Sequence, residues 1–181
     1  MEQTEKKKFD AKNEAFEWIE AIVVSLVAVI LVFTFIFRIV SIDGNSMNNT
    51  LHDQDRVMIS HLFYTPKRGD IVVLGIPNMD KPIIKRIIGM AGDRIEVDYD
   101  TDIVKVNGEM VSEPYIKEDM LPKGQVTFPI EVPEGKIFVM GDNRNDSLDS
   151  RYYEVGFVDV DDIIGQAMFR LFPFNKIGGL K

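Results

Sequence analysis

The chain has 181 residues, of which 45% are hydrophobic and 28% charged, so it can form a modest folded domain and is not a fully disordered protein. Its net charge of -8 argues against a nucleic-acid partner, because phosphate binding needs clustered lysine and arginine. The chain has no cysteine and no histidine pair at metal-binding spacing, which excludes thiol chemistry, disulfides and the common zinc sites. We expect neither a metal nor an organic cofactor.

The first predicted element is a transmembrane helix over residues 18–38, preceded by a charged arm over residues 1–17. A nearly continuous apolar run of about 20 residues can cross the hydrocarbon layer of a bilayer as one helix. Trp18 and Arg38 suit the two interfaces of the membrane. A cleaved signal peptide and a buried core helix are the alternatives, and the first is disfavoured because no small-x-small cleavage site follows the run.

The charges on either side of this segment predict its orientation. The lysines that precede it are Lys6, Lys7, Lys8 and Lys12. Only Arg38, and later Arg56, follow it closely, so the positive-inside rule places the N-terminus in the cytoplasm. We therefore expect a single-pass protein of the cell membrane with residues 39–181 as an extracytoplasmic domain.

Beyond the membrane segment, the pattern is typical of short β-strands separated by turns. Strands are expected over residues 57–59, 71–74, 82–88, 94–97, 103–106, 109–111, 136–140 and 163–171. Asn107-Gly108 predicts a two-residue hairpin turn. No helical periodicity follows residue 51, which favours a mainly β, antiparallel, barrel-like domain. Residues 113–133 contain four prolines and are expected to leave the sheet, in a role that the sequence does not define.

Two residues suggest a nucleophile and its base. Ser46 lies in a polar turn directly after the membrane segment, where a serine more often satisfies backbone groups than reacts. Lys85 shares a strand face with Ile83 and Ile87, and such neighbours lower the pKa of an amine by removing water from it. A neutral amine can accept the proton of a serine hydroxyl. The alternatives are an edge-strand lysine that reaches water and, for the base, His52.

A third polar stretch follows the strand expected at residues 136–140. It reads Gly141-Asp142-Asn143-Arg144-Asn145-Asp146-Ser147-Leu148-Asp149-Ser150-Arg151. An ordinary polar turn would explain such residues, because aspartate and asparagine bond to their own backbone. Their density also suits a loop that orients a neighbouring site.

Taken together, these stretches resemble the bacterial type I signal peptidases, which are membrane-bound serine proteases that remove signal peptides. The resemblance covers nearly the whole chain and includes three blocks in the family's order: Gly-x-Ser-Met at residue 44, Lys-Arg-Ile-Ile-Gly-x-x-Gly-Asp at residue 85, and Gly-Asp-Asn-Arg-x-x-Ser-x-Asp-Ser-Arg at residue 141. The single membrane segment and small size are similar to the Gram-positive form.

The resemblance implies a role for each matching residue. Ser46 matches the nucleophile, Lys85 the general base, and Ser147 a serine that orients the lysine by a hydrogen bond. Residues that brace the site by ion pairing are Arg86, Asp142, Asp149 and Arg151. Apolar residues expected to line a pocket for small side chains are Ile42, Met47, Leu51 and Ile84. The oxyanion hole would use the backbone N–H of Ser46. Gly44 stands where the family often has a hydroxyl, so a second donor would have to come from elsewhere.

The implied reaction is cleavage through an acyl-enzyme, and the implied substrates are exported preproteins with small residues at the first and third positions before the cut. The lipid bilayer is an expected partner, and transient association with the secretion translocon is consistent with the resemblance. One departure is Asn49, where the family usually has a proline that stiffens the turn. We expect reduced rigidity or altered specificity there, with activity retained.

Two other functions are compatible with parts of the pattern. A self-cleaving Ser/Lys repressor is disfavoured by the membrane segment and by the lack of a DNA-binding module. A membrane-anchored β domain that binds signal peptides without cutting them would be expected to have lost Ser46 or Lys85, and both are present. The phenylalanines of residues 169–174 are expected either to dip into the outer leaflet or to end a core strand.

Overall fold

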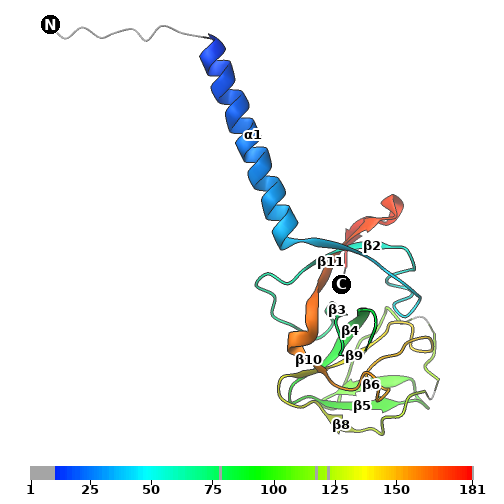
Figure 1. Ribbon diagram of the computed structural model, residues 1–181. Coiled ribbons are helices and arrows are strands. Elements are labelled where there is room, and N and C mark those ends of the chain that lie inside the picture. Colours follow the sequence, from blue (N-terminus) through cyan, green and yellow to red (C-terminus); the bar gives the residue numbers. More distant parts are fainter. Residues whose placement is uncertain (1–10, 78, 117, 122, 181) are drawn as a thin grey trace, which may run out of the picture. The chain divides into compact units, whose positions relative to one another are not determined.

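The computed structural model describes residues 11–77, 79–116, 118–121 and 123–180 (Figure 1). The chain divides into two compact units, one up to Ile36 and one from Phe37 onward. Lys6, Lys7 and Lys8, whose charge predicts the orientation of the membrane segment, lie outside the described residues.

The N-terminal unit contains one long helix, α1 (Ala11–Ile36). Within it, Glu14–Ile36 is long and apolar enough to cross a membrane by length and composition. The helix starts seven residues before the predicted span because alanine, lysine and glutamate in the preceding arm favour helix. Its described apolar side chains are exposed as far as Phe35, which suits a helix surrounded by lipid.

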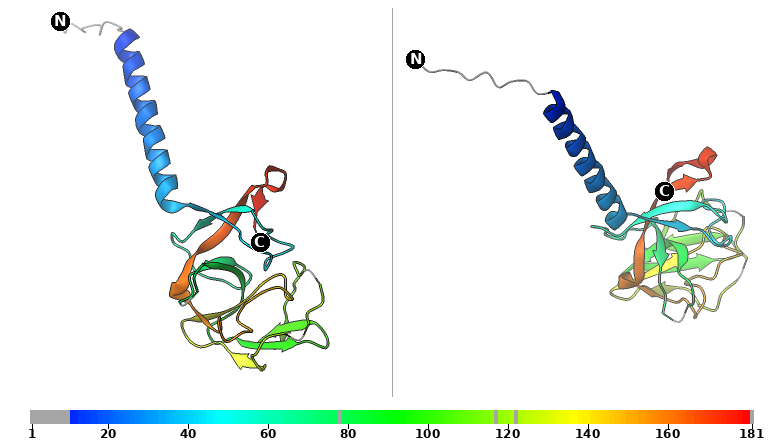
Figure 2. Two further views of the ribbon diagram at one scale, coloured as in Figure 1. Left: turned by 45° about the vertical axis from the view of Figure 1, so that its right-hand side comes forward. Right: turned by 45° about the horizontal axis from the view of Figure 1, so that its top comes forward.

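The second unit is mainly antiparallel β-sheet. Its larger sheet has the strand order β1 (Arg38–Ser41), β2 (Arg56–Ser60), β11 (Ile163–Phe172), β3 (Ile71–Leu74), β4 (Ile83–Met90), β9 (Lys136–Met140) and β10 (Val158–Asp159), with β12 (Gly178–Gly179) paired to β11. Figure 2 shows from two further sides that this sheet is curled into a half-barrel. The predicted mainly β, antiparallel, barrel-like domain with one N-terminal helix is confirmed.

The smaller sheet has the order β7 (Glu109–Met110), β6 (Ile103–Val106), β5 (Arg94–Asp98) and β8 (Ile130–Glu131). The turn between β6 and β7 has positive φ at Asn107 (56°) and Gly108 (82°), as a type I′ hairpin requires, so the predicted hairpin is confirmed. Two short 3₁₀ helices complete the described elements, η1 (Val160–Asp162) and η2 (Phe174–Lys176).

Three apolar clusters hold this unit together, and one of them lies under the Ser46 turn. Its buried members are Ile42, Met47, Leu51, Val57, Ile59, Ile71, Val73, Ile84 and Ala167. A second cluster contains Ile87, and Ile83 packs against it. These two neighbours of Lys85 therefore lie on one face of the strand, as predicted. The third cluster joins the smaller sheet to β9 through Ile95 and Phe138.

Sequence patterns missed three of the four two-residue strands among the described residues and placed one boundary wrongly. Strands β8, β10 and β12 have two residues each, too few for an alternation to be recognised. Arg38, predicted to close the membrane helix, is instead the first residue of β1, because α1 ends at Ile36. The chain is apolar on both sides of this boundary, so hydrophobicity alone could not separate helix from strand.

Candidate active site

Ser46 lies in a turn that is fixed on both sides by buried residues. Before it, the backbone of Ile42 donates to the Asp55 carbonyl at 2.8 Å, and Gly44 takes a φ of +95° that glycine adopts without strain. After it, the Met47 side chain is almost fully buried in the apolar cluster under the turn. Ser46 itself is half-buried, so its hydroxyl is held in place and still reaches the surface.

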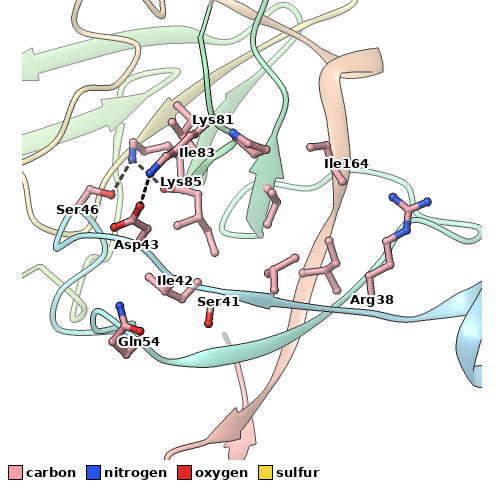
Figure 3. Close-up of a pocket in the computed structure, with 15 residues that line it drawn as sticks. Arg38, Ser41, Ile42, Asp43, Ser46, Gln54, Lys81, Ile83, Lys85 and Ile164 are labelled. Atoms are coloured by element: carbon pink, nitrogen blue, oxygen red, sulfur yellow. Dashed lines mark hydrogen bonds and ion pairs between the residues drawn. The ribbon is translucent and has the colours of Figure 1, made fainter.

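Lys85 projects from the middle of the larger sheet. β4 lies between β3 and β9, so it is not an edge strand, and only 3% of Lys85 is exposed. Its Nζ lies 2.7 Å from Ser46 Oγ and donates to the Ile84 carbonyl at 2.9 Å (Figure 3). The interpretation of Lys85 as a water-reaching lysine on a sheet edge is therefore wrong.

The surroundings of Lys85 favour its neutral form. Burial lowers the pKa of Lys85 from 10.5 to about 8, against the opposing effect of the Asp149 and Asp142 carboxylates, which favour the charged amine. The Arg151 guanidinium lowers the pKa further. A substantial fraction of the amine is then neutral near physiological pH and able to accept a proton from Ser46.

Two buried ion pairs lie beside the amine. Arg86 makes a bidentate contact with Asp142, with distances of 2.9 and 2.7 Å, and Arg151 makes one with Asp149 at 2.8 and 2.9 Å. All four side chains are at most 2% exposed. Because each carboxylate has its own guanidinium, little net negative charge remains to hold Lys85 in its protonated form.

The loop at residues 141–151 also contacts the Ser46 turn directly. Asn143 donates from its backbone to the Ser46 carbonyl at 3.0 Å and from its side chain to the Asn45 carbonyl at 3.1 Å. Gly141 is so close that a Cβ atom there would lie 2.5 Å from the Ser46 carbonyl oxygen and 2.3 Å from Ser147 Oγ. The sequence pattern indicated this loop but gave no role to Asn143 or Gly141, because both act through contacts with the Ser46 turn, which is almost a hundred residues away in the chain.

The predicted hydrogen bond from Ser147 to Lys85 is not formed in this structure. Ser147 Oγ is buried and has no hydrogen-bond partner among the described residues, while the Lys85 amine is engaged by Ser46 and Ile84. Ser147 packs over Gly141 instead, which keeps it near the Ser46 backbone.

A pocket of about 680 Å³ opens beside Ser46 and Lys85. The other residues that line it are Arg38, Val40, Ser41, Ile42, Asp43, Gln54, Ile59, Val73, Lys81, Pro82, Ile83, Ile84 and Ile164. Ile42 and Ile84 line the pocket, whereas Met47 and Leu51 do not reach it and are buried in the same apolar cluster as these two isoleucines. Asp43 and Lys81, both largely exposed, form an ion pair of 3.0 Å across the pocket.

Backbone groups around the pocket are available to a ligand. Among the described strands, β1 is an edge strand that pairs only with β2. The pairing of β4 with β9 begins at Arg86, so residues 83–85 have no strand partner on that side. Gly44 N–H donates to Asp53 at 2.9 Å, whereas the Ser46 N–H meets no acceptor among the described residues. The described residues also contain no group of three or more acidic, His or Cys side chains placed to hold a metal.

Comparison with known proteins identifies similar chains. The model of the family "Signal peptidase, peptidase S26" matches residues 15–172. A signal peptidase I from Bacillus licheniformis is 39% identical over 184 residues, covering 96% of this chain and 97% of the relative. Signal peptidase IB from Staphylococcus aureus is 36% identical over 183 residues, covering 91% and 93%. A crystal structure of a signal peptidase I from Enterococcus faecalis is 32% identical with a TM-score of 0.47, covering 57% of this chain and 97% of that one.

Proposed function

The chain belongs to the signal peptidase family, peptidase S26, and on that basis we propose that Ser46 is its nucleophile and Lys85 its general base. It is a signal peptidase I, a serine endopeptidase that removes signal peptides from preproteins. The observation that supports the two assignments best is the 2.7 Å distance between Ser46 Oγ and the Nζ of a lysine that is only 3% exposed.

The reaction starts with transfer of the Ser46 hydroxyl proton to the neutral Lys85 amine as Oγ bonds to the scissile carbonyl carbon. The Ser46 N–H is the available donor to the developing oxyanion, a type of contact that contributes about 3 kcal/mol to the transition state. Collapse breaks the C–N bond, and Lys85 returns the proton to the leaving amine. Lys85 then takes a proton from water as the water oxygen bonds to the acyl carbon, and returns that proton to Ser46 Oγ as the bond between Oγ and the acyl carbon breaks.

The preprotein binds as an extended strand between β1 and residues 83–85. Both segments have free backbone groups, so a peptide can pair with them as an added strand. Side chains of such a peptide alternate, and those on one face meet Ile42 and Ile84 on the pocket floor. This geometry supports small residues at the first and third positions before the cut.

Cleavage of a preprotein by the full chain in detergent tests the two assignments. Ser46→Ala and Lys85→Ala are expected to abolish cleavage while both proteins stay folded. His52→Ala is the matched control, because His52 is the other candidate base and has no contact with Ser46 among the described hydrogen bonds. Cleavage by either dyad variant, or its loss in His52→Ala, would reject the assignment.

We also propose the domain layout and topology: a cytoplasmic arm over residues 1–17, a membrane span from residue 18 to the end of α1 at Ile36, and an extracytoplasmic catalytic domain from Phe37 onward. The long apolar helix and the four N-terminal lysines support it. Because the chain has no cysteine, Lys12→Cys and Tyr153→Cys each introduce one reporter. In intact cells, a membrane-impermeant maleimide should label only the second; labelling of the first would reverse the topology.

The bilayer is proposed to contact the C-terminal end of the catalytic domain. Phe172, Phe174 and Ile177 are 41%, 78% and 50% exposed, although β11 begins in the core at Ile163. Trp18 is the only tryptophan, so Trp18→Phe with Phe174→Trp gives a single fluorescent reporter in the full chain. Brominated lipids should quench it but not the matched Trp18→Phe, Tyr153→Trp protein; equal quenching would reject the contact. Transient association with the secretion translocon stays a prediction.

A further inference from the structure

Residues 113–116, 118–121 and 123–126, here called the strap, lie against the loop at residues 141–151 that approaches both Ser46 and Lys85. We propose that the strap positions the catalytic machinery, with Glu113 and Tyr115 as its positioning residues. This inference builds on the proposed function and assigns a role to a segment that the sequence left undefined.

The first contact of the strap is made by Glu113. Its carboxylate forms a bidentate ion pair with Arg144, in which Nη1 donates at 3.1 Å, and the two side chains are 6% and 1% exposed. Arg144 Nε in turn donates to the Gly141 carbonyl at 3.1 Å. Since Gly141 packs on the Ser46 backbone, only one side chain separates Glu113 from the nucleophile turn.

Tyr115 makes the second contact, with Arg86. Its ring lies 3.8 Å from the guanidinium carbon of Arg86, and its hydroxyl donates to Glu113 at 2.9 Å. Arg86 is the residue that neutralises Asp142 and neighbours Lys85 in β4. The aromatic ring therefore fixes the guanidinium from its face while Asp142 binds its edge.

Further along, the strap holds the rest of the loop by its backbone. Asn145 accepts from Leu121 N–H at 2.9 Å and donates to the Asp119 carbonyl at 2.9 Å. The Arg151 carbonyl accepts from the N–H groups of Gln125 and Val126 at 2.8 and 3.1 Å. Such a close approach is possible because Gly124 has no side chain: a Cβ there would lie 2.7 Å from the Arg151 carbonyl oxygen.

These contacts give the strap influence over the charge state of Lys85. The charged groups that act on the amine are Asp142, Asp149 and Arg151 of the 141–151 loop. Arg86 of β4 enters through Asp142, because its guanidinium binds that carboxylate. If Arg86 loses its ring contact and moves from Asp142, the uncompensated carboxylate favours the protonated amine. Loss of the strap contact should therefore shift the pH dependence of cleavage to higher pH as well as slow it.

A pair of substitutions at Tyr115, tested in the full chain in detergent, isolates the ring contact. Tyr115→Phe keeps the ring over Arg86 and should retain kcat within about threefold, whereas Tyr115→Leu removes the ring and should lower kcat about tenfold. KM should stay within about twofold, because no strap residue lines the substrate pocket. Only Tyr115→Leu should move the acid limb of the pH profile to higher pH.

Two further variants separate positioning from simple stability. Val158→Ala removes buried methyl groups from the second apolar cluster, which contains no strap residue, and should lower the melting temperature without moving the pH midpoint. Glu113→Gln keeps the shape of the side chain but leaves Arg144 without its counter-charge, so it should lower kcat. This variant provides the test if Tyr115→Leu does not fold. A folded Tyr115→Leu protein with the wild-type kcat and the wild-type pH midpoint would overturn the proposal. A Tyr115→Leu protein that loses activity while its pH midpoint stays unmoved would also overturn it. If Tyr115→Leu does not fold, a wild-type kcat in Glu113→Gln would do the same. None of these results bears on Ser46→Ala, which tests the proposed function itself.

Discussion

Lys85 Nζ and Ser46 Oγ lie 2.7 Å apart, although 39 residues separate them in the chain. Lys85 is carried by a central strand and Ser46 by a turn that the core anchors through Ile42 and Met47, so both partners are fixed before a substrate arrives. An amine in this position must be neutral in order to accept the proton of Ser46. Burial does this, and its consequences can be measured.

The first consequence concerns stability. The pKa of Lys85 falls from 10.5 in the unfolded chain to about 8 in the folded protein, mainly by burial. The unfolded chain thus binds this proton more tightly, and the difference destabilises the fold by about 3 kcal/mol at pH 7. The penalty is complete below pH 8 and is relieved as the pH rises from about 8 to 10.5.

Lys85→Met is therefore expected to abolish cleavage and to raise the free energy of unfolding at pH 7, measured by denaturant titration in detergent. The rise in stability between pH 8 and 10.5 should disappear in this variant. Ser46→Ala, which leaves the buried amine in place, should keep it. A Lys85→Met protein no more stable than wild type at pH 7 would contradict a desolvated lysine.

A second prediction tests the close packing between Gly141 and the nucleophile turn. Gly141→Ala places a methyl group within 2.5 Å of the Ser46 carbonyl oxygen, so the turn or the 141–151 loop has to move. A displacement of about 1 Å at the reacting groups should lower kcat about a hundredfold. Gly178→Ala is the control, because no atom of the described residues lies within 4 Å of its added carbon. Similar kcat values for the two variants would show that this packing is unimportant.

Local patterns in the sequence predicted most of the fold. The β-branched runs at residues 71–74 and 136–140 and the Asn107-Gly108 turn each determine structure over a few residues, and all three are confirmed. Of the two-residue strands, β7 was predicted because the Asn107-Gly108 turn precedes it, whereas β8, β10 and β12 were missed because pairing with other strands, and not local preference, creates them.

The site was less accessible to sequence reasoning. Motifs indicated Ser46 and Lys85, but the contact of Glu113 with Arg144 spans 31 residues and that of Asn143 with Ser46 spans almost a hundred. Met47 and Leu51 were expected to line the pocket and are instead buried in an apolar cluster, since strand and turn geometry decide which side of a surface a residue occupies.

A third prediction concerns the ion pair of Asp43 and Lys81. Because it crosses the pocket, a bound peptide must separate or bypass it. Both groups are largely exposed, so Asp43→Asn or Lys81→Gln should change kcat/KM by less than about fivefold. Either substitution should make KM less dependent on salt concentration than in the wild type, because the ion pair is lost. The exchanged variant Asp43→Lys, Lys81→Asp, which can form the pair again, should restore the wild-type salt dependence. A salt dependence of KM unaltered in all three variants would show that the pair does not hinder binding.

A fourth prediction concerns Asn49, an exposed residue that stands where the family usually has proline. Its N–H makes no hydrogen bond with the described residues, so proline removes no backbone contact there. Asn49→Pro should stiffen the turn that carries Ser46 and increase the rate of preprotein cleavage. Asn49→Ala, which lacks the ring constraint, serves as the control. Equal rates for wild type and Asn49→Pro would show that this position is immaterial.

The pH dependence of kcat/KM for preprotein cleavage by the full chain tests the neutral-lysine mechanism most directly. Burial sets the pKa of Lys85 at about 8, so the rate should rise about tenfold per pH unit at low pH and level off above this value. A midpoint near about 6.5 would indicate a histidine base, and one near about 10.5 would indicate a lysine in contact with water. Either result would contradict the assignment of Lys85 as a buried, neutral base for Ser46.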